Sequence, residues 1–192
     1  MTNSRPLSRP VLLISNSLSG GGAEAVARLM VAEIANSSCV LFENDARIEI
    51  SGKRITAASK SHRGGVLFTV LVSVWRLLVI QWEKALLRPR LSISHLEGPN
   101  FANLVTVFGG PRAIFVHNTL AKSYPTNGRR DSLMRALCRA LYRHASIIVA
   151  VSPEIKSELK EFLAPDSPKI VTLRQWRTNC LQSRRRHLHF FQ

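Results

Sequence analysis

Short apolar runs alternate with segments whose apolar residues recur at helical spacing along most of the chain. Residues 11–14 form the first run, and no polar residue interrupts it, which is typical of a strand buried on both faces of a parallel sheet. Residues 15–22 are polar and rich in glycine, and the apolar residues of 23–35 then fall on one helical face. This order of strand, glycine turn and helix predicts the opening of a βαβ unit.

The alternation continues to residue 173. Further strands are predicted at 38–42, 54–57, 91–96, 113–116, 146–151 and 169–173. Further helices are predicted at 65–87, at 99–107, from a cap at Asp131 and from a cap at Ser152. We therefore expect an α/β fold with a single Rossmann-like, doubly wound parallel sheet, which binds ligands at the carboxyl ends of its strands.

The segment 65–87 is the longest apolar stretch of the chain. A helix that crosses a bilayer needs about 20 mostly apolar residues, and Arg76 interrupts this segment near its middle. We therefore expect a long helix that is mostly buried against the sheet.

Charge adds information about partners. The 192 residues hold 27 Lys and Arg against 12 Asp and Glu, a formal net charge of +15. Nucleic acid, an anionic membrane surface, a phosphate-bearing substrate and an ordinary solvated surface all remain open. No basic strand rich in aromatic residues occurs, so we expect no specific nucleic acid. Basic residues border the long apolar helix, which favours membrane contact, namely Arg63, Arg76, Lys84, Arg88 and Arg90.

The glycine-rich stretch from Ser19 to Glu24 lies between the first strand and the first helix. Glycines let a backbone approach a ligand, and a helix N-terminus offers amide groups to an anion such as phosphate. A tight structural turn is the alternative interpretation. The stretch also fits a dinucleotide pattern through Gly20, Gly22 and Ala25, with Glu43 placed to bind a ribose. No Lys-Ser or Lys-Thr pair follows, which excludes a P-loop.

Polar residues end two further strands. His117 ends the apolar run 113–116, and His95 and Glu97 end the strand that starts near Leu91. Side chains at these places can face a substrate, although a lone histidine is more often structural. His95 and Glu97 lack an evident third partner for a metal site. On the helix after Ser152 the acids Glu154, Glu158 and Glu161 indicate a solvated face.

Four motifs together resemble the N-terminal domain of GT-B glycosyltransferases, specifically of retaining glycosyltransferase family four. They are Ser19-Gly-Gly-Gly-Ala-Glu24, Ser92-Ile-Ser-His-Leu-Glu97, Phe115-Val-His-Asn118 and Ala150-Val-Ser-Pro-Glu154. The first and last motifs are the most specific. The similarity extends over roughly residues 10–173.

The resemblance implies a domain that binds the acceptor of sugar transfer. Its glycine loop would approach the diphosphate and sugar of a nucleotide-sugar, and His117 would contact the transferred sugar as the catalytic histidine. The substrate-binding residues it implies are Gly20, Gly21, Gly22, Glu24, His95, Glu97 and Asn118. Transfer would retain anomeric configuration, need neither metal nor cofactor, use a glycan or lipid-linked acceptor, and serve cell-surface polysaccharide synthesis.

The resemblance also implies a cytoplasmic protein, peripheral on the inner face of the membrane, and the three scattered cysteines fit a reducing compartment. The donor-binding domain of the family, with its paired-glutamate motif, has no counterpart in this sequence. We expect residues 1–173 to form the acceptor-side domain. Residues 174–192 hold five arginines and no acid, which indicates an irregular basic tail. A truncated or frame-shifted product that is inactive alone would explain both features, and a natural tail on a small protein is the alternative.

Overall fold

The computed structural model describes residues 9–43, 50–59, 65–125 and 128–174. Its strands are β1 Val11–Ser15, β2 Ser37–Leu41, β3 Arg54–Ala57, β4 Leu91–His95, β5 Arg112–Val116, β6 Ile147–Ala150 and β7 Lys169–Thr172. Its helices are α1 Gly22–Glu33, α2 Val66–Leu87, α3 Glu97–Val105, α4 Leu120–Ser123, α5 Arg129–Tyr142 and α6 Pro153–Leu163. The elements alternate as the hydrophobic pattern predicts, apart from the single turn of α4, for which the sequence gives no signal.

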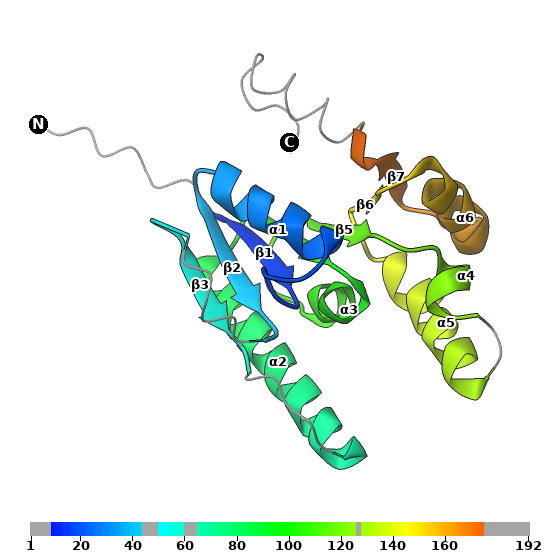
Figure 1. The fold of residues 1–192 in the computed structure, drawn as a ribbon, viewed down its shortest axis with the longest axis horizontal. Coiled ribbons are helices and arrows are strands. Elements are labelled where there is room, and N and C mark those ends of the chain that lie inside the picture. The colour runs from blue at the N-terminus through cyan, green and yellow to red at the C-terminus, as the bar shows by residue number, and fades with distance from the viewer. Residues whose placement is uncertain (1–8, 44–49, 60–64, 126–127, 175–192) are drawn as a thin grey trace, which may run out of the picture. The chain divides into compact units, whose positions relative to one another are not determined.

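The described strands form one sheet in the order β3-β2-β1-β4-β5-β6-β7 (Figure 1). The pairs β1–β2, β1–β4, β2–β3 and β6–β7 are parallel. The first strand, β1, lies in the sheet interior, and the chain then winds outward to β3 and returns to β4 on the other side of β1, which is the order of Rossmann-like folds. The predicted α/β fold with one doubly wound parallel sheet is confirmed.

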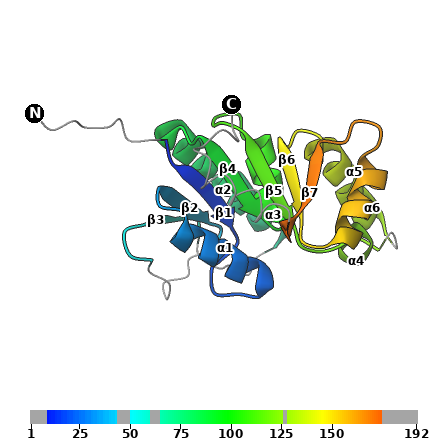
Figure 2. The same ribbon diagram turned by 90° about the horizontal axis from the view of Figure 1, so that it is seen from above.

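Residues 1–113 form one compact unit. Within it α1 covers one face of the sheet, and α2 and α3 cover the other (Figures 1 and 2). Side chains alternate along β1, so that Leu12 and Ile14 join Ile80 of α2 and Ala102 of α3 in one buried cluster. This packing on both faces fixes the strand ends from which the loops at the carboxyl edge begin.

Residues 114–192 form a second compact unit. In it β6 pairs with β7, α6 packs on both strands, and α4 and α5 pack on α6. The Ser152 hydroxyl accepts a hydrogen bond from the Ile155 amide at 3.4 Å, and Pro153 occupies the first turn of α6, as the sequence predicts. A single domain over residues 1–173 remains a prediction, and the tail at 175–192 lies outside the described residues.

The burial of α2 differs from its prediction. Ile80, Glu83 and Lys84 are buried, but most of its large apolar side chains are exposed, so the expectation of a mostly buried helix was wrong. At 22 residues α2 is about 33 Å long, whereas a five-residue strand extends only about 17 Å. The sheet is therefore too short to cover the helix, and the N-terminal end of α2 extends beyond it (Figure 1).

Candidate functional site

The carboxyl edge of β1 and β4 is the natural ligand-binding position of this sheet. β1 lies between β2 and β4, and all three strands run parallel. The chain leaves β1 toward β2 on one side while β4 lies on the other, which makes this edge the topological switch point. The loop after β1 and the turn after β4 both start here, and both belong to the first unit.

The loop after β1 is held from two sides. The carbonyl oxygen of Asn16 accepts a hydrogen bond from the Glu43 amide at 2.9 Å. Arg28 reaches back from α1 and donates to the carbonyl oxygen of Leu18 at 3.3 Å, and the Leu18 side chain is fully buried. These hydrogen bonds therefore fix the backbone directly before the three glycines.

The three glycines of the loop have ordinary backbone conformations, because none of them has a φ in the left-handed region. A Cβ at Gly22 would meet nothing within 4 Å, and one at Gly21 would meet only the Glu24 carboxylate, at 3.9 Å. Local structure requires glycine where φ is positive or space is lacking, and neither condition holds at these two positions. The interpretation as a ligand-contacting loop is therefore favoured over a structural turn.

Glu24 lies in the first turn of α1, and its side chain folds back over the glycine loop. A Cβ at Gly20 would come within 2.8 Å of Glu24 Cδ. No side chain caps α1, so the amides of its first turn can bind a ligand. A carboxylate accepts hydrogen bonds from hydroxyl groups and repels phosphate. Glu24 therefore suits a sugar hydroxyl, and the open amides suit an anion.

The turn after β4 brings two predicted residues to the same edge. His95 ends β4 and is completely buried, so its ring belongs to the base of the site and not to its open surface. Leu96 has φ +72° and ψ 161°, a region almost reserved for glycine, where strain often accompanies function. Glu97 opens α3, half-buried. A Cβ at Gly98 would lie 4.0 Å from Asn16 Oδ1, so the start of α3 abuts the loop after β1.

A buried polar network supports β4 and α3 from below. Ser94 Oγ donates to Asn100 Oδ1 at 2.8 Å and accepts from Asn103 Nδ2 at 3.1 Å. Lys84 Nζ donates to Asn103 Oδ1 and Thr106 Oγ1, each at 2.7 Å, and to the Asn103 carbonyl oxygen at 2.9 Å. Burial lowers the pKa of Lys84 to about 7. These bonds fix β4, α3 and α2 to one another, and thereby hold the strained turn at Leu96.

His117 and Asn118 follow β5 in the second unit, and both are half-buried. The His117 ring stacks on Phe115 of β5, with ring centroids 6.4 Å apart and an interplanar angle of 26°. This contact orients the imidazole at the carboxyl end of its strand. The roles of His117 and Asn118 in substrate contact remain predictions.

Glu158 has a structural role, whereas the sequence predicted a side chain on a solvated helix face. Its carboxylate accepts hydrogen bonds from the amides of Leu120 at 2.8 Å and Ala121 at 2.9 Å. These amides belong to the first turn of α4, so Glu158 caps that helix from α6. The interpretation of Glu158 as part of a solvated face was wrong, because pairing across 38 residues leaves no mark in the local sequence.

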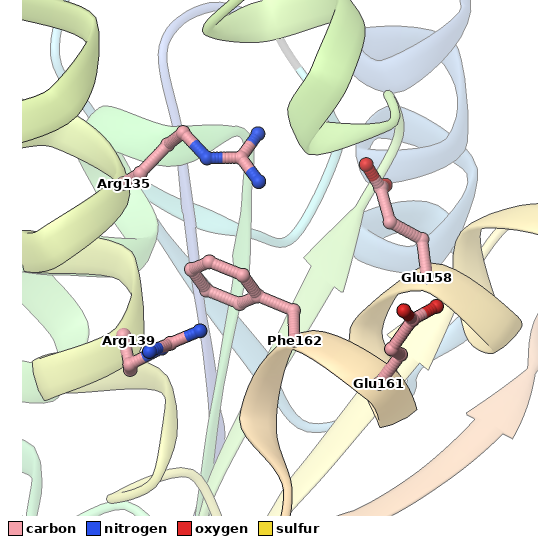
Figure 3. Close-up of a pocket in the computed structure, with 5 residues that line it drawn as sticks. All are labelled: Arg135, Arg139, Glu158, Glu161 and Phe162. Carbon is pink, nitrogen blue, oxygen red and sulfur yellow. The ribbon is translucent and has the colours of Figure 1, made fainter. Parts of the chain in front are cut away.

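A hollow of about 320 Å³ lies between α5 and α6 (Figure 3). Its lining is Arg135, Arg139, Glu158, Glu161 and Phe162. The guanidinium carbons of Arg135 and Arg139 stand 5.3 and 4.7 Å from the centre of the Phe162 ring, at distances typical of cation–π contacts. Because the arginines hold the ring and Glu158 holds α4, these side chains serve the packing of the second unit.

The part of the chain that the structure describes contains no candidate metal site. No group of three or more His, Cys, Asp or Glu side chains is placed there to hold a metal ion.

The predicted site residues fall into two groups. The first group lies at the carboxyl ends of β1 and β4, in the loop after β1, the first turn of α1, the end of β4 and the start of α3, and consists of Gly20, Gly21, Gly22, Glu24, His95 and Glu97. His117 and Asn118 belong to the second unit. Leu96 and Asn16 were not predicted as site residues, and a leucine gives no sign of a strained backbone in the sequence. The position of Asn16 directly after a buried strand was the available signal.

Comparison with known proteins finds similarity in structure only. No protein-family model matches the chain, and no curated protein matches it by sequence. Sucrose-phosphate synthase from Thermosynechococcus elongatus superposes with a TM-score of 0.68 at 14% identity, over 86% of this chain and 47% of that one. UGT2 of Phytolacca americana, complexed with UDP-2-fluoro-glucose and pterostilbene, superposes with a TM-score of 0.56 at 13% identity, over 86% and 54%. A UGT transferase from Siraitia grosvenorii in complex with UDP gives 0.54 at 9% identity, over 85% and 50%.

The fold is therefore that of GT-B glycosyltransferase domains. The chain spans about half the length of these three proteins.

Proposed function

We propose that this chain is the acceptor-side domain of a glycosyltransferase that moves a sugar from a nucleotide-sugar to a glycan or a lipid-linked acceptor. One observation carries the proposal, namely the open glycine loop at the carboxyl edge of β1. Gly21 and Gly22 are glycines that neither backbone conformation nor crowding requires, and they precede a helix without a side-chain cap.

Each part of the site has a role in this proposal. The amides at the start of α1 approach the diphosphate of the donor, and Glu24 accepts hydrogen bonds from hydroxyl groups of its sugar. Glu97 and Asn118 contact substrate, and His95 supports the turn that carries Glu97 from its buried position. His117 contacts the transferred sugar. Phosphate contacts of this kind agree with the UDP and UDP-2-fluoro-glucose bound by two proteins of the same fold.

The finer assignments belong to the proposal as well. Transfer proceeds with retention, as in glycosyltransferase family four, without a metal ion, and requires a donor-binding domain in addition to the residues of this site. The product contributes to cell-surface polysaccharide, made in the cytoplasm at the inner face of the membrane. The anomeric configuration of the product, read by NMR from the reaction of this chain with an added donor domain, tests retention. An inverted product would contradict it.

The direct test is a titration of the ¹⁵N-labelled chain with UDP-glucose, followed by amide chemical shifts, which detect even millimolar binding. We expect the largest changes at Gly20, Gly21, Gly22 and Glu24, followed by the turn at Leu96. Changes confined to other residues, or none at saturating ligand, would contradict the proposal.

A matched pair of variants sharpens the test. Gly21 and Gly65 both precede a helix with extended backbone and without a side-chain cap, and a Cβ at Gly65 would meet nothing within 4 Å. We expect Gly21→Val to weaken UDP-glucose binding about tenfold or more, a loss of about 1.4 kcal/mol. Gly65→Val should leave the affinity unchanged. Equal effects of the two substitutions would remove the glycine loop from the site.

A dinucleotide-binding domain of the oxidoreductase type is the second candidate, because Glu43 lies where such a domain places its ribose-binding acid. Glu43 is exposed just beyond β2, and its amide donates to Asn16 in the loop after β1. Titration with NADH, followed by its fluorescence, tests this candidate. Micromolar binding that is lost in Glu43→Ala would favour it over sugar transfer.

A further inference from the structure

α2 is amphipathic, but its apolar side faces outward and its charged side chains face the sheet, which is the reverse of an ordinary surface helix. At 100° per residue one side of the helix carries only apolar residues, and this side faces away from the sheet. Leu67 is 74% exposed and Trp82 is 69% exposed. The other large residues of this outward face are Leu71, Val74, Trp75, Leu78 and Leu86, each about half exposed or more.

The charged residues of α2 point toward the domain and have partners there. Arg76 lies over the Phe42 ring at 4.8 Å, and its Nε donates to Ser59 Oγ at 3.2 Å. Glu83 accepts from Arg54 at 2.8 Å and is 4% exposed. Lys84, bound to the network of α3, is fully buried. The outward face therefore lacks charge, because the charged side chains of α2 all bond to residues on its inward side.

The apolar surface continues onto the loop between α3 and β5. The Val107 amide donates to Gln81 Oε1 at 3.1 Å, which places this loop beside α2. Val107 and Phe108 are both more than half exposed. A contiguous apolar surface of this extent is rare on a protein that stays in water and marks a surface that something covers.

The charges around this apolar surface indicate which kind of partner covers it. The sequence contains no Asp or Glu between residues 50 and 82, Glu83 is buried in an ion pair, and the next acid is Glu97. Arg88 and Arg90 are exposed directly after the C-terminal end of α2. Glu43 is an exposed acid, but it interacts with Arg76 on the inward side of α2. The segments that border the outward face supply cations and no exposed acid, so this face repels a second copy of itself and attracts an anionic surface.

The two tryptophans match a lipid interface. Trp75 Nε1 donates to the carbonyl oxygen of Ala58 at 2.8 Å, so its polar group is satisfied while the ring stays 56% exposed. Tryptophan is enriched where bilayers meet water, with arginine and lysine at the level of the headgroups. The helices that the structure describes include none long and apolar enough to cross a membrane.

We propose that the outward face of α2, with Val107 and Phe108, docks this chain on an anionic lipid bilayer, where α2 lies in the plane of the interface. The inference rests on the proposed function only in that a membrane-bound acceptor gives the docking its purpose. A domain docked in this way meets a lipid-linked acceptor by diffusion in two dimensions.

Co-sedimentation of the full chain with vesicles tests the docking. We expect binding to phosphatidylcholine vesicles that contain phosphatidylglycerol, and much weaker binding to pure phosphatidylcholine. Leu78→Ser combined with Trp82→Ser should weaken binding about tenfold or more. Leu133→Ser combined with Leu137→Ser is the matched control, because these residues are also exposed leucines, on α5, and it should bind like the unchanged chain.

Several outcomes would overturn the docking. They are equal binding by both double variants, equal binding to charged and neutral vesicles, and a dimer in solution that only Leu78→Ser with Trp82→Ser abolishes. Far-UV circular dichroism checks the folding of each variant, and Trp82→Ser alone serves if the double variant unfolds. Quenching of tryptophan fluorescence by brominated lipid, in a Trp176→Phe background, is a second measurement and should be lost with the docking.

The docking and the proposed function fail separately. UDP-glucose should still shift the amides of Gly20 to Gly22 in the double variant of α2. A chain that binds vesicles but not UDP-glucose would contradict only sugar transfer, and the reverse result would contradict only the docking.

Discussion

Two helices of this chain follow buried strands but begin in opposite ways. α6 starts with Ser152, whose hydroxyl accepts a hydrogen bond from the Ile155 amide. Glu154 follows, and its pKa is lowered mainly by its hydrogen bond with Ser152. α1 starts with three glycines and no side-chain cap. The start of α6 is capped by its own side chains, while the start of α1 has no side-chain cap.

The difference between the two helix starts concerns the stability that a side-chain cap contributes. A side-chain cap contributes about 1 kcal/mol, and α1 lacks this contribution although Ser19 and Asn16 stand nearby in the sequence. α4 is closed as well, by Glu158. Under the proposed function, the contrast is that of a ligand-binding helix start with structural helix starts, and the following predictions test it in order of decreasing effect on the free energy of unfolding.

Glu158→Ala removes two hydrogen bonds between a carboxylate and the first amides of α4. We expect the free energy of unfolding, measured by urea denaturation, to fall by about 2 kcal/mol. The UDP-glucose titration at Gly20 to Gly22 should not change. A large change there would mean that the capped helix ends also belong to the binding site.

Leu96→Gly relieves a backbone conformation that leucine adopts at a cost of about 1–3 kcal/mol. Part of this gain is offset by the greater freedom of glycine in the unfolded chain, so we expect stability to rise by about 1 kcal/mol. UDP-glucose affinity should fall, because the turn is no longer held rigid. Leu96→Ala keeps the strain and is the control, in which stability should not rise.

Ser152→Ala removes the cap of α6. Thermal or urea denaturation should show a loss of about 1 kcal/mol. Restoration by Ser152→Asp, which caps equally well, would confirm that the loss comes from the cap. A loss that Asp does not restore would assign the role of Ser152 to packing.

Gly22→Ala has the smallest expected effect on stability, and the effect is a gain, opposite to the losses expected for Glu158→Ala and Ser152→Ala. Alanine fits the open position and reduces the freedom of the unfolded chain, so we expect a gain of about 0.5 kcal/mol. UDP-glucose binding should weaken at the same time. A variant that is both more stable and unchanged in binding would show that the loop has no ligand.

The sequence was sufficient for the fold because apolar runs and helical periodicity are local signals. β1, β3 and α6 lie within a residue or two of their predictions, and the glycine loop and His95 fall at the strand ends as expected. Features that depend on distant partners could not be predicted this way. The exposure of α2 depends on the length of the sheet beside it, the cap from Glu158 joins residues 38 apart, and the strain at Leu96 comes from its surroundings.

The inward charges of α2 also restrict how the helix can move. A shift by one residue turns a helix by about 100°, which would separate Glu83 from Arg54 and Lys84 from Asn103 and would carry a charge onto the apolar side. Rolling is therefore blocked at three places along the helix, including Arg76 against Phe42. We therefore expect α2 to move only together with α3, β3 and Phe42, to which its charged side chains are joined.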